Sequence, residues 1–108
     1  MPLRMTLQTV MVLRALMSNP THEFYGRELA DATGLMPGTT HPILVRLEHE
    51  GWVVSRKEDI DPRQEKRPAR RYYRLTAGGA MAASEAIRKS RRPSDAVLGG
   101  LTEEGTTG

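Results

Sequence analysis

The residues with the clearest chemistry are cations gathered in one short segment. Residues 52–75 carry eight basic and four acidic side chains, whereas residues 1–51 have a net charge of −1 and residues 76–108 a net charge of 0. Within the basic segment, residues 66–74 contain five cations and no anion. Such a concentration is typical of a surface that binds a polyanion such as nucleic acid. A solvated loop that keeps the protein soluble is the alternative interpretation.

Catalytic and metal-binding chemistry has no support in the sequence. There are no cysteines, which excludes disulfides, thiolate metal sites and cysteine nucleophiles. His41 and His49 would lie roughly 12 Å apart along one helix, which is too far to share a metal ion. No paired carboxylates, glycine-rich phosphate loop or nucleophile motif is present. We therefore expect no enzymatic activity, no metal site and no cofactor.

A helix over residues 39–50, ended by Gly51, is predicted to present a polar face to a partner. At about 100° per residue, four residues fall on one apolar face. They are Thr40, Ile43, Leu44 and Leu47. The opposite face, with its flanks, consists of Pro42, Val45, His49, His41 and Arg46. One side of this helix is therefore expected to be buried and the other to be free for contacts.

The start of this helix is predicted at Thr39, which serves as the N-cap and leaves Pro37 and Gly38 in the preceding turn. Pro42 is then the third residue of the helix, where a missing N–H costs no hydrogen bond. Val45 is expected to be exposed although it is apolar. It is either a lone surface residue or a methyl group that contacts thymine in a major groove.

Two further helices precede this one. Thr6 caps a core helix that runs to about Ser18. A short helix over residues 26–33 follows and is ended by Gly34. Together with the turn and the helix over residues 39–50, it forms a helix-turn-helix pattern.

Two strands are predicted next, over residues 52–57 and 70–75. In the second strand, Tyr73 and Leu75 share one face. The segment between the strands contains Asp-Pro, Arg-Pro and mixed charge, so it is predicted to project as a mobile loop. A helix-turn-helix followed by a basic hairpin is a winged helix. The predicted fold class is α+β, mainly helical: a winged helix-turn-helix over residues 1–75 with one C-terminal dimerisation helix.

The C-terminal helix is predicted over residues 77–89, capped by Thr76. Its thin apolar face suggests packing against the same helix of a second subunit, and folding back on its own domain is the alternative. The candidate dimerisation residues are Ala80, Met81, Ala83 and Ile87. Residues 90–108 lack periodicity and are predicted to be a disordered tail. Because no signal peptide or membrane-spanning stretch is present, we expect a cytoplasmic protein.

Three stretches of the chain resemble the PadR family of transcriptional regulators. They are F-Y-G-R-E-L-A (24–30), G-L-M-P-G-T-T-H-P-I-L-V-R-L-E-H-E-G-W (34–52) and R-R-Y-Y-R-L-T-A-G-G (70–79). The resemblance implies a winged-helix homodimer that represses promoters, with Thr39 to Pro42 and Arg46 on the recognition helix and residues 66–71 on the wing. Two features depart from the family. The chain has Thr40-His41 where the family often has Leu-Tyr, and its C-terminal region is short.

These features together predict a sequence-specific DNA-binding regulator whose homodimer reads a near-palindromic operator. The helix over residues 39–50 would lie in the major groove, and the basic segment 58–71 on the backbone or in the minor groove. The candidate DNA-binding residues are Pro37, Thr39, Thr40, His41, Pro42, Val45, Arg46, Lys66, Arg67, Arg70 and Arg71. A protein-interaction module and a non-specific architectural DNA-binding protein are the alternatives. The sequence identifies no small-molecule effector.

Overall fold

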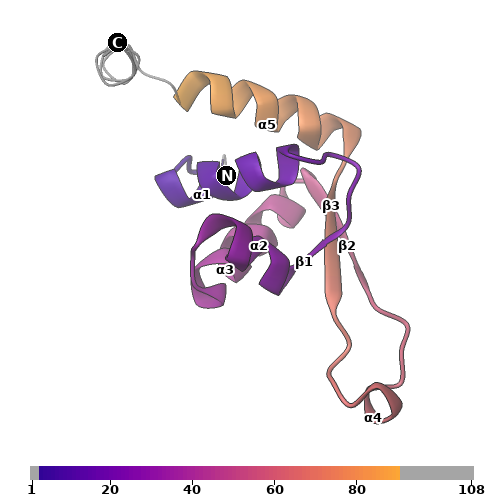
Figure 1. Ribbon diagram of the computed structural model, residues 1–108. Helices are drawn as coiled ribbons and strands as arrows, with labels where there is room; N and C mark the ends of the chain where they lie inside the picture. Colours follow the sequence, from indigo (N-terminus) through magenta and orange to yellow (C-terminus); the bar gives the residue numbers. More distant parts are fainter. Residues whose placement is uncertain (1–2, 91–108) are drawn as a thin grey trace.

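The computed structural model describes residues 3–90, which form helices and one three-stranded sheet. In chain order the elements are α1 (Leu7–Met17), β1 (Phe24–Tyr25), α2 (Gly26–Thr33), α3 (Pro37–His49), β2 (Val53–Lys57), α4 (Pro62–Glu65), β3 (Arg71–Leu75) and α5 (Ala77–Ser90). Figure 1 shows α1 and α5 side by side at one end, with α2 and α3 beneath α1. The β2–β3 hairpin extends away from the body and carries α4 at its tip. The predicted tail over residues 90–108 lies outside the described residues, except for Ser90.

The first helix, α1, is the centre of the core. Val12, Leu13 and Leu16 are almost completely buried, and α1 contacts α2, α3 and α5. The helix begins where the Thr6 hydroxyl accepts a hydrogen bond from the Thr9 amide at 3.2 Å. The predicted cap and extent of this helix are confirmed. None of the helices within residues 3–90 is long and apolar enough to cross a membrane.

The helices α2 and α3 form the helix-turn-helix. Gly34 ends α2 with a φ of 75°, a left-handed conformation that glycine adopts without a steric penalty. Ile43, Leu44 and Leu47 of α3 are buried beneath α1 and α2. The apolar face predicted from the helical period is therefore confirmed.

The start of α3 differs from the prediction. The helix begins at Pro37 rather than after an N-cap at Thr39, and the Met36 carbonyl accepts from the amides of Thr39 and Thr40 at 2.8 and 3.1 Å. Proline suits a first helical position because its φ is already helical and its missing N–H has no partner there. Pro42 consequently lies inside the helix, where it removes one backbone hydrogen bond. The prediction that Pro42 occupies the first turn is wrong.

The sheet has the strand order β1-β3-β2 and is antiparallel throughout. The predicted pairing of β2 with β3 is confirmed, with Val53 opposite Leu75 and Ser55 opposite Tyr73. The pairing of Phe24 in β1 with Tyr73 is an addition that the sequence did not predict. Val53, Tyr73 and Leu75 are buried on the core side. The hairpin is thereby fixed to the helices at its base.

Residues 58–71, called the wing below, are more structured than the predicted mobile loop. They contain α4, whose first turn is capped by the Asp61 carboxylate at 3.0 Å from the Arg63 amide. Lys66 ends α4 in the left-handed region with a φ of 58°. The composition of this segment predicted a polar projection correctly, but not its helical turn.

The last helix, α5, folds back onto its own subunit. Thr76 caps it by accepting from the Gly79 amide at 2.8 Å, as predicted. Ala83 is completely buried against the core, so it is not available to a second subunit. The other candidate dimerisation residues that pack on this core are Ala80 and Ile87. Only Met81 of that set is largely exposed, at 77%.

Candidate nucleic-acid interface

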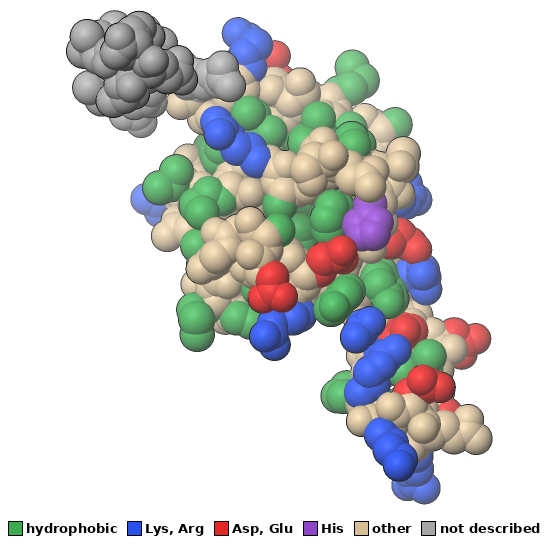
Figure 2. All heavy atoms as spheres, in the orientation of Figure 1, with side chains coloured by type: hydrophobic (Ala, Val, Ile, Leu, Met, Phe, Trp, Pro, Cys, Tyr) green, Lys and Arg blue, Asp and Glu red, His purple; other side chains and the backbone are tan. Residues whose placement is uncertain are grey.

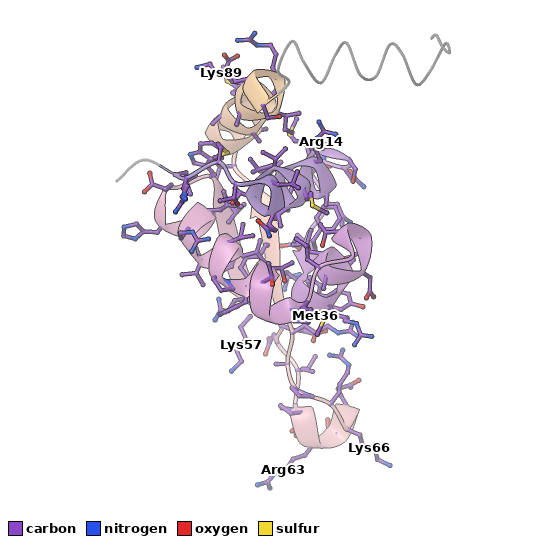
Figure 3. All side chains as sticks on the ribbon, turned by 90° about the vertical axis from the view of Figure 1, so that its left-hand side faces the viewer. Arg14, Met36, Lys57, Arg63, Lys66 and Lys89 are labelled. Carbon is purple, nitrogen blue, oxygen red and sulfur yellow. The ribbon has the colours of Figure 1, made fainter. Side chains whose placement is uncertain are left out.

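The helix α3 and the wing lie on the side of α1 that is away from α5 (Figure 1). Figure 3 shows Met36 at the start of α3, Lys57 at the end of β2, and Arg63 and Lys66 at the wing tip, all in the lower half of the view. In Figure 2, lysine and arginine side chains gather along the wing, with acidic side chains between them. A helix and a hairpin that project on one side can engage a groove and the adjacent backbone of a DNA duplex.

The outward side of α3 is an exposed row of chemically varied residues. Its members are Pro37, Gly38, His41, Pro42, Val45, Arg46 and His49. Val45 is 48% exposed, as predicted for a residue away from the core. Thr39 is half-buried at the edge of the row. A methyl-bearing side chain, an imidazole and a guanidinium on one face provide groups that contact base edges and phosphates.

Thr40 does not belong to this exposed row. It is 1% exposed, and its hydroxyl donates to the Pro37 carbonyl at 3.3 Å. A buried hydroxyl with a partner cannot reach DNA while the first turn of α3 is intact. Thr40 is therefore a core residue, and we withdraw it from the predicted DNA contacts.

Three exposed cations extend from the end of β2 to the wing tip. Lys57, Arg63 and Lys66 have no ion-pair partner within residues 3–90. Only Lys66 was among the predicted contacts, because that prediction followed the anion-free run over residues 66–74. Lys57 and Arg63 could have been found from their places among the predicted elements, because Lys57 ends a strand and Arg63 lies in the projecting segment between the two strands.

Arg67 is engaged within the wing rather than free. Its guanidinium donates from two nitrogens to the Glu58 carboxylate, at 2.7 and 3.0 Å. This ion pair raises the pKa of Arg67. The sequence suggested a cation that faces DNA, whereas the structure places Arg67 at the base of the wing.

Arg70 and Arg71 lie where the wing meets the sheet. The Arg70 guanidinium stacks over the Tyr25 ring, 4.2 Å from its centroid. Arg71 donates to the Ser55 hydroxyl at 3.0 Å, and that hydroxyl donates to Glu48 of α3 at 2.6 Å. Arg71 is thereby linked to α3, while Arg70 packs on Tyr25 of β1.

A depression of about 330 Å³ lies where the starts of α2 and α3 meet β3. It is lined by Gly26, Arg27, Pro37, Thr40, His41, Leu44 and Tyr73. Tyr73 is only 4% exposed, and burial raises its pKa, so its phenol remains a hydrogen-bond donor. The first amides of α2 also lack intrahelical acceptors. Hydrogen-bond donors of this kind suit an anion. The strand alternation in the sequence did not suggest that Tyr73 could donate to one.

The sequence model of the transcriptional regulator PadR-like family matches residues 12–85. This chain belongs to the PadR-like family of transcriptional regulators. The match begins in α1 and ends in α5, so it includes the helix-turn-helix, the sheet and the wing. The resemblance seen in the sequence is confirmed.

Relatives of this PadR-like chain support the same assignment. Transcriptional regulator Rv3488 of Mycobacterium tuberculosis is 39% identical over 72 residues, which are 67% of this chain and 63% of that protein. The chain therefore spans less than two thirds of that relative's length. Wild-type MarR of E. coli in its apo form is 21% identical, with 97% of this chain and 81% of that chain covered and a TM-score of 0.61. A transcriptional regulator homologue from Pyrococcus horikoshii is 19% identical, with coverages of 87% and 82% and a TM-score of 0.61. The structural likenesses show the winged-helix fold.

The ionisation of Glu58 in this PadR-like protein leads to a pH prediction. The Arg67 guanidinium, followed by the Arg70 amide, holds the pKa of Glu58 at about 2, below its ordinary value of 4.5. Because the folded-state pKa is lowered, the carboxylate stabilises the wing above pH 4.5, and this contribution is lost as the pH falls from 4.5 towards 2. NMR of the Glu58 carboxyl carbon should show a midpoint near 2, which rises in Arg67→Gln. A wild-type midpoint near 4.5 would contradict the ion pair.

Proposed function

We propose that this protein is a sequence-specific DNA-binding regulator that acts as a homodimeric repressor. The observation that carries the proposal is that the exposed row of α3 and the exposed cations of the wing both lie on the side of α1 that is away from α5. In this arrangement α3 enters the major groove, and the wing follows the backbone or the minor groove. Contacts of α3 supply sequence discrimination, and contacts of the wing supply most of the affinity.

The exposed row of α3 offers distinct contacts to DNA. Arg46 is placed to bind a phosphate or the acceptor edge of a guanine, and Val45 to contact a thymine methyl. His41 lies one turn closer to the start of α3 and can donate to a base or a phosphate. Thr39 and the Gly38 amide, at the positive end of the helix, suit a phosphate.

The remaining cations act on the DNA backbone. These cations are Lys57 at the end of β2, Arg63 and Lys66 in the wing, and Arg71 next to α3, and they give affinity that does not depend on sequence. Tyr73 and the start of α2 provide donors for one further phosphate in the depression. The clustering of these groups on one side supports DNA over a protein partner, whose surface need not be anionic.

The layer of α1 and α5 is the proposed dimer contact. It lies at the end of the molecule opposite the wing, and it exposes Met81 by 77% and Leu7 by 75%. A second copy that covers these side chains would leave both copies of α3 free. Two subunits related by a two-fold axis would read half-sites roughly 34 Å apart, hence a near-palindromic operator. A dimer seated on such a site in a promoter would exclude other proteins and repress transcription.

Selection from a random duplex library by the purified protein tests the proposed function. We expect enrichment of a near-palindromic sequence at about 0.15 M salt, where non-specific contacts are weak. Retention of DNA without enrichment would instead indicate architectural binding. A failure to retain any duplex would contradict DNA binding and favour a protein-interaction module.

The dimer contact leads to a mutational prediction. Met81→Glu places a charge on the exposed side of α5, so the protein should sediment as a monomer and lose most of its affinity for the selected duplex. At a protein concentration low enough that the wild type is also monomeric, its unfolding midpoint should match that of the wild type, because Met81 is 77% exposed within its own subunit. Asn19→Glu adds the same charge at an exposed position between α1 and β1 and is the control. If the Met81→Glu protein remained dimeric, the proposal that α5 forms the dimer contact would be wrong.

A further inference from the structure

Glu58 is bound by several groups at the base of the wing. Its carboxylate accepts two hydrogen bonds from the Arg67 guanidinium at 2.7 and 3.0 Å and one from the Arg70 amide at 3.1 Å. The Tyr72 hydroxyl lies 3.4 Å from the same carboxylate. The Glu58 amide in turn donates to the Arg70 carbonyl at 2.7 Å, beyond the last paired residues of β2 and β3. The side chain of Glu58 is only 16% exposed.

We propose that Glu58 is a positioning residue that holds the cations of the wing in their DNA-binding arrangement. This inference rests on the DNA-binding function proposed above. Residues 59–66 connect Glu58 to Arg67, so the ion pair between these two residues closes the loop that carries Arg63 and Lys66. Closing the loop in the free protein lowers the entropy that must be lost when the wing meets DNA.

The direction in which DNA affinity changes when Glu58 is replaced distinguishes a positioning role from a purely electrostatic one. A carboxylate close to DNA repels the phosphates, so its removal should by charge alone tighten binding and steepen the salt dependence. Removal of Glu58 also releases Arg67, which would add a further free cation near the DNA. If Glu58 acts by positioning, its loss instead weakens binding in spite of both electrostatic gains.

The test compares four variants with the wild type by affinity for the selected duplex. Glu58→Gln should bind about tenfold more weakly, because the glutamine amide cannot accept both donors of Arg67. The exposed neighbour Asp59→Asn removes the same charge and should bind as tightly as the wild type or more tightly. Arg67→Gln should match Glu58→Gln, and the double variant should lose no more than either single one. All of these proteins should remain folded in the binding assay, because the Glu58–Arg67 pair lies outside the buried core and only the stabilisation of the wing is lost.

A second measurement tests the Glu58–Arg67 pair in the absence of DNA. Amide hydrogen exchange over residues 59–69 should accelerate in Glu58→Gln and remain unchanged in Asp59→Asn. If the wild-type protein bound no duplex, the proposed DNA-binding function would be wrong. The exchange measurement would still decide whether Glu58 orders the wing. Unchanged exchange in Glu58→Gln, or binding as tight as that of Asp59→Asn, would overturn the inference. An Arg67→Gln variant with a salt slope reduced by about one would make Arg67 a phosphate contact and also overturn it.

Discussion

Gly79→Ala is expected to lower the free energy of unfolding by about 3 kcal/mol, and urea unfolding followed by circular dichroism measures this loss. A Cβ at position 79 would lie 1.9 Å from the Trp52 carbonyl oxygen, closer than any real contact. The obstacle is backbone and cannot rotate away. The same carbonyl accepts from the Thr76 amide at 3.0 Å, so moving it would also disturb the start of α5. The close approach of α5 to the Trp52 backbone, just before β2, therefore requires glycine.

Gly78→Ala is the matched control for this prediction. Gly78 precedes Gly79 in α5, and a Cβ there would have no atom within 4 Å. Helix propensity alone predicts a gain of about 0.5–1 kcal/mol from alanine at either position. A loss of stability in Gly79→Ala together with a gain in Gly78→Ala would identify the Trp52 carbonyl as the cause of the loss. Equal stability of the two variants would show that α5 does not pack as closely as the structure indicates.

Gly38→Glu is expected to abolish specific DNA binding without unfolding the protein. Gly38 is the second residue of α3 and is exposed, and a Cβ added to it would meet no atom within 4 Å. A carboxylate there stabilises the helix by about 0.3–1 kcal/mol through the dipole at its N-terminus. The same carboxylate would face the DNA phosphates, and like-charge contact costs several kcal/mol in binding. Fluorescence anisotropy with the selected duplex should show a loss of about 100-fold or more.

The control for Gly38→Glu is again Asn19→Glu, which changes the net charge equally at a position outside α3 and the wing. The affinity of this variant for the duplex should fall only slightly, because salt screens a single charge that lies far from the DNA. If both variants bound alike, total charge rather than the face of α3 would govern affinity. If Gly38→Glu bound as tightly as the wild type, α3 would not be the DNA-facing helix.

Local pattern was sufficient for the elements whose residues are close in sequence. The 3.6-residue period of α3 predicted its buried residues, and the alternation of β3 predicted that Tyr73 and Leu75 share one face, which is buried in the structure. The caps at Thr6 and Thr76 were also predicted, because a cap bonds an amide only three residues away. These features depend on short-range geometry and therefore leave a direct signal in the chain.

The candidate interface was predicted only in part. The exposed side of α3 follows from its helical period, whereas its start does not, because both Pro37 and Thr39 carry the chemistry of a helix start. A run of cations cannot show which member is paired, so Arg67 and Lys66 were given the same role. The structure distinguishes them, since Arg67 meets Glu58 and Lys66 remains exposed at the tip.

The sequence by itself determined the order of α1, α2, α3, β2, β3 and α5, the buried face of α3, the alternation of β3, and the basic character of the wing. Only the tertiary structure decided that β1 joins the sheet, that Ala83 faces α1 and that Tyr73 lines a depression. Each of these depends on contacts between residues far apart in the chain. A face that is apolar can bury itself against its own domain or a second copy, and the residues of that face are the same in both cases. The choice is made by which surface the rest of the chain brings within reach, and short-range patterns do not contain that information.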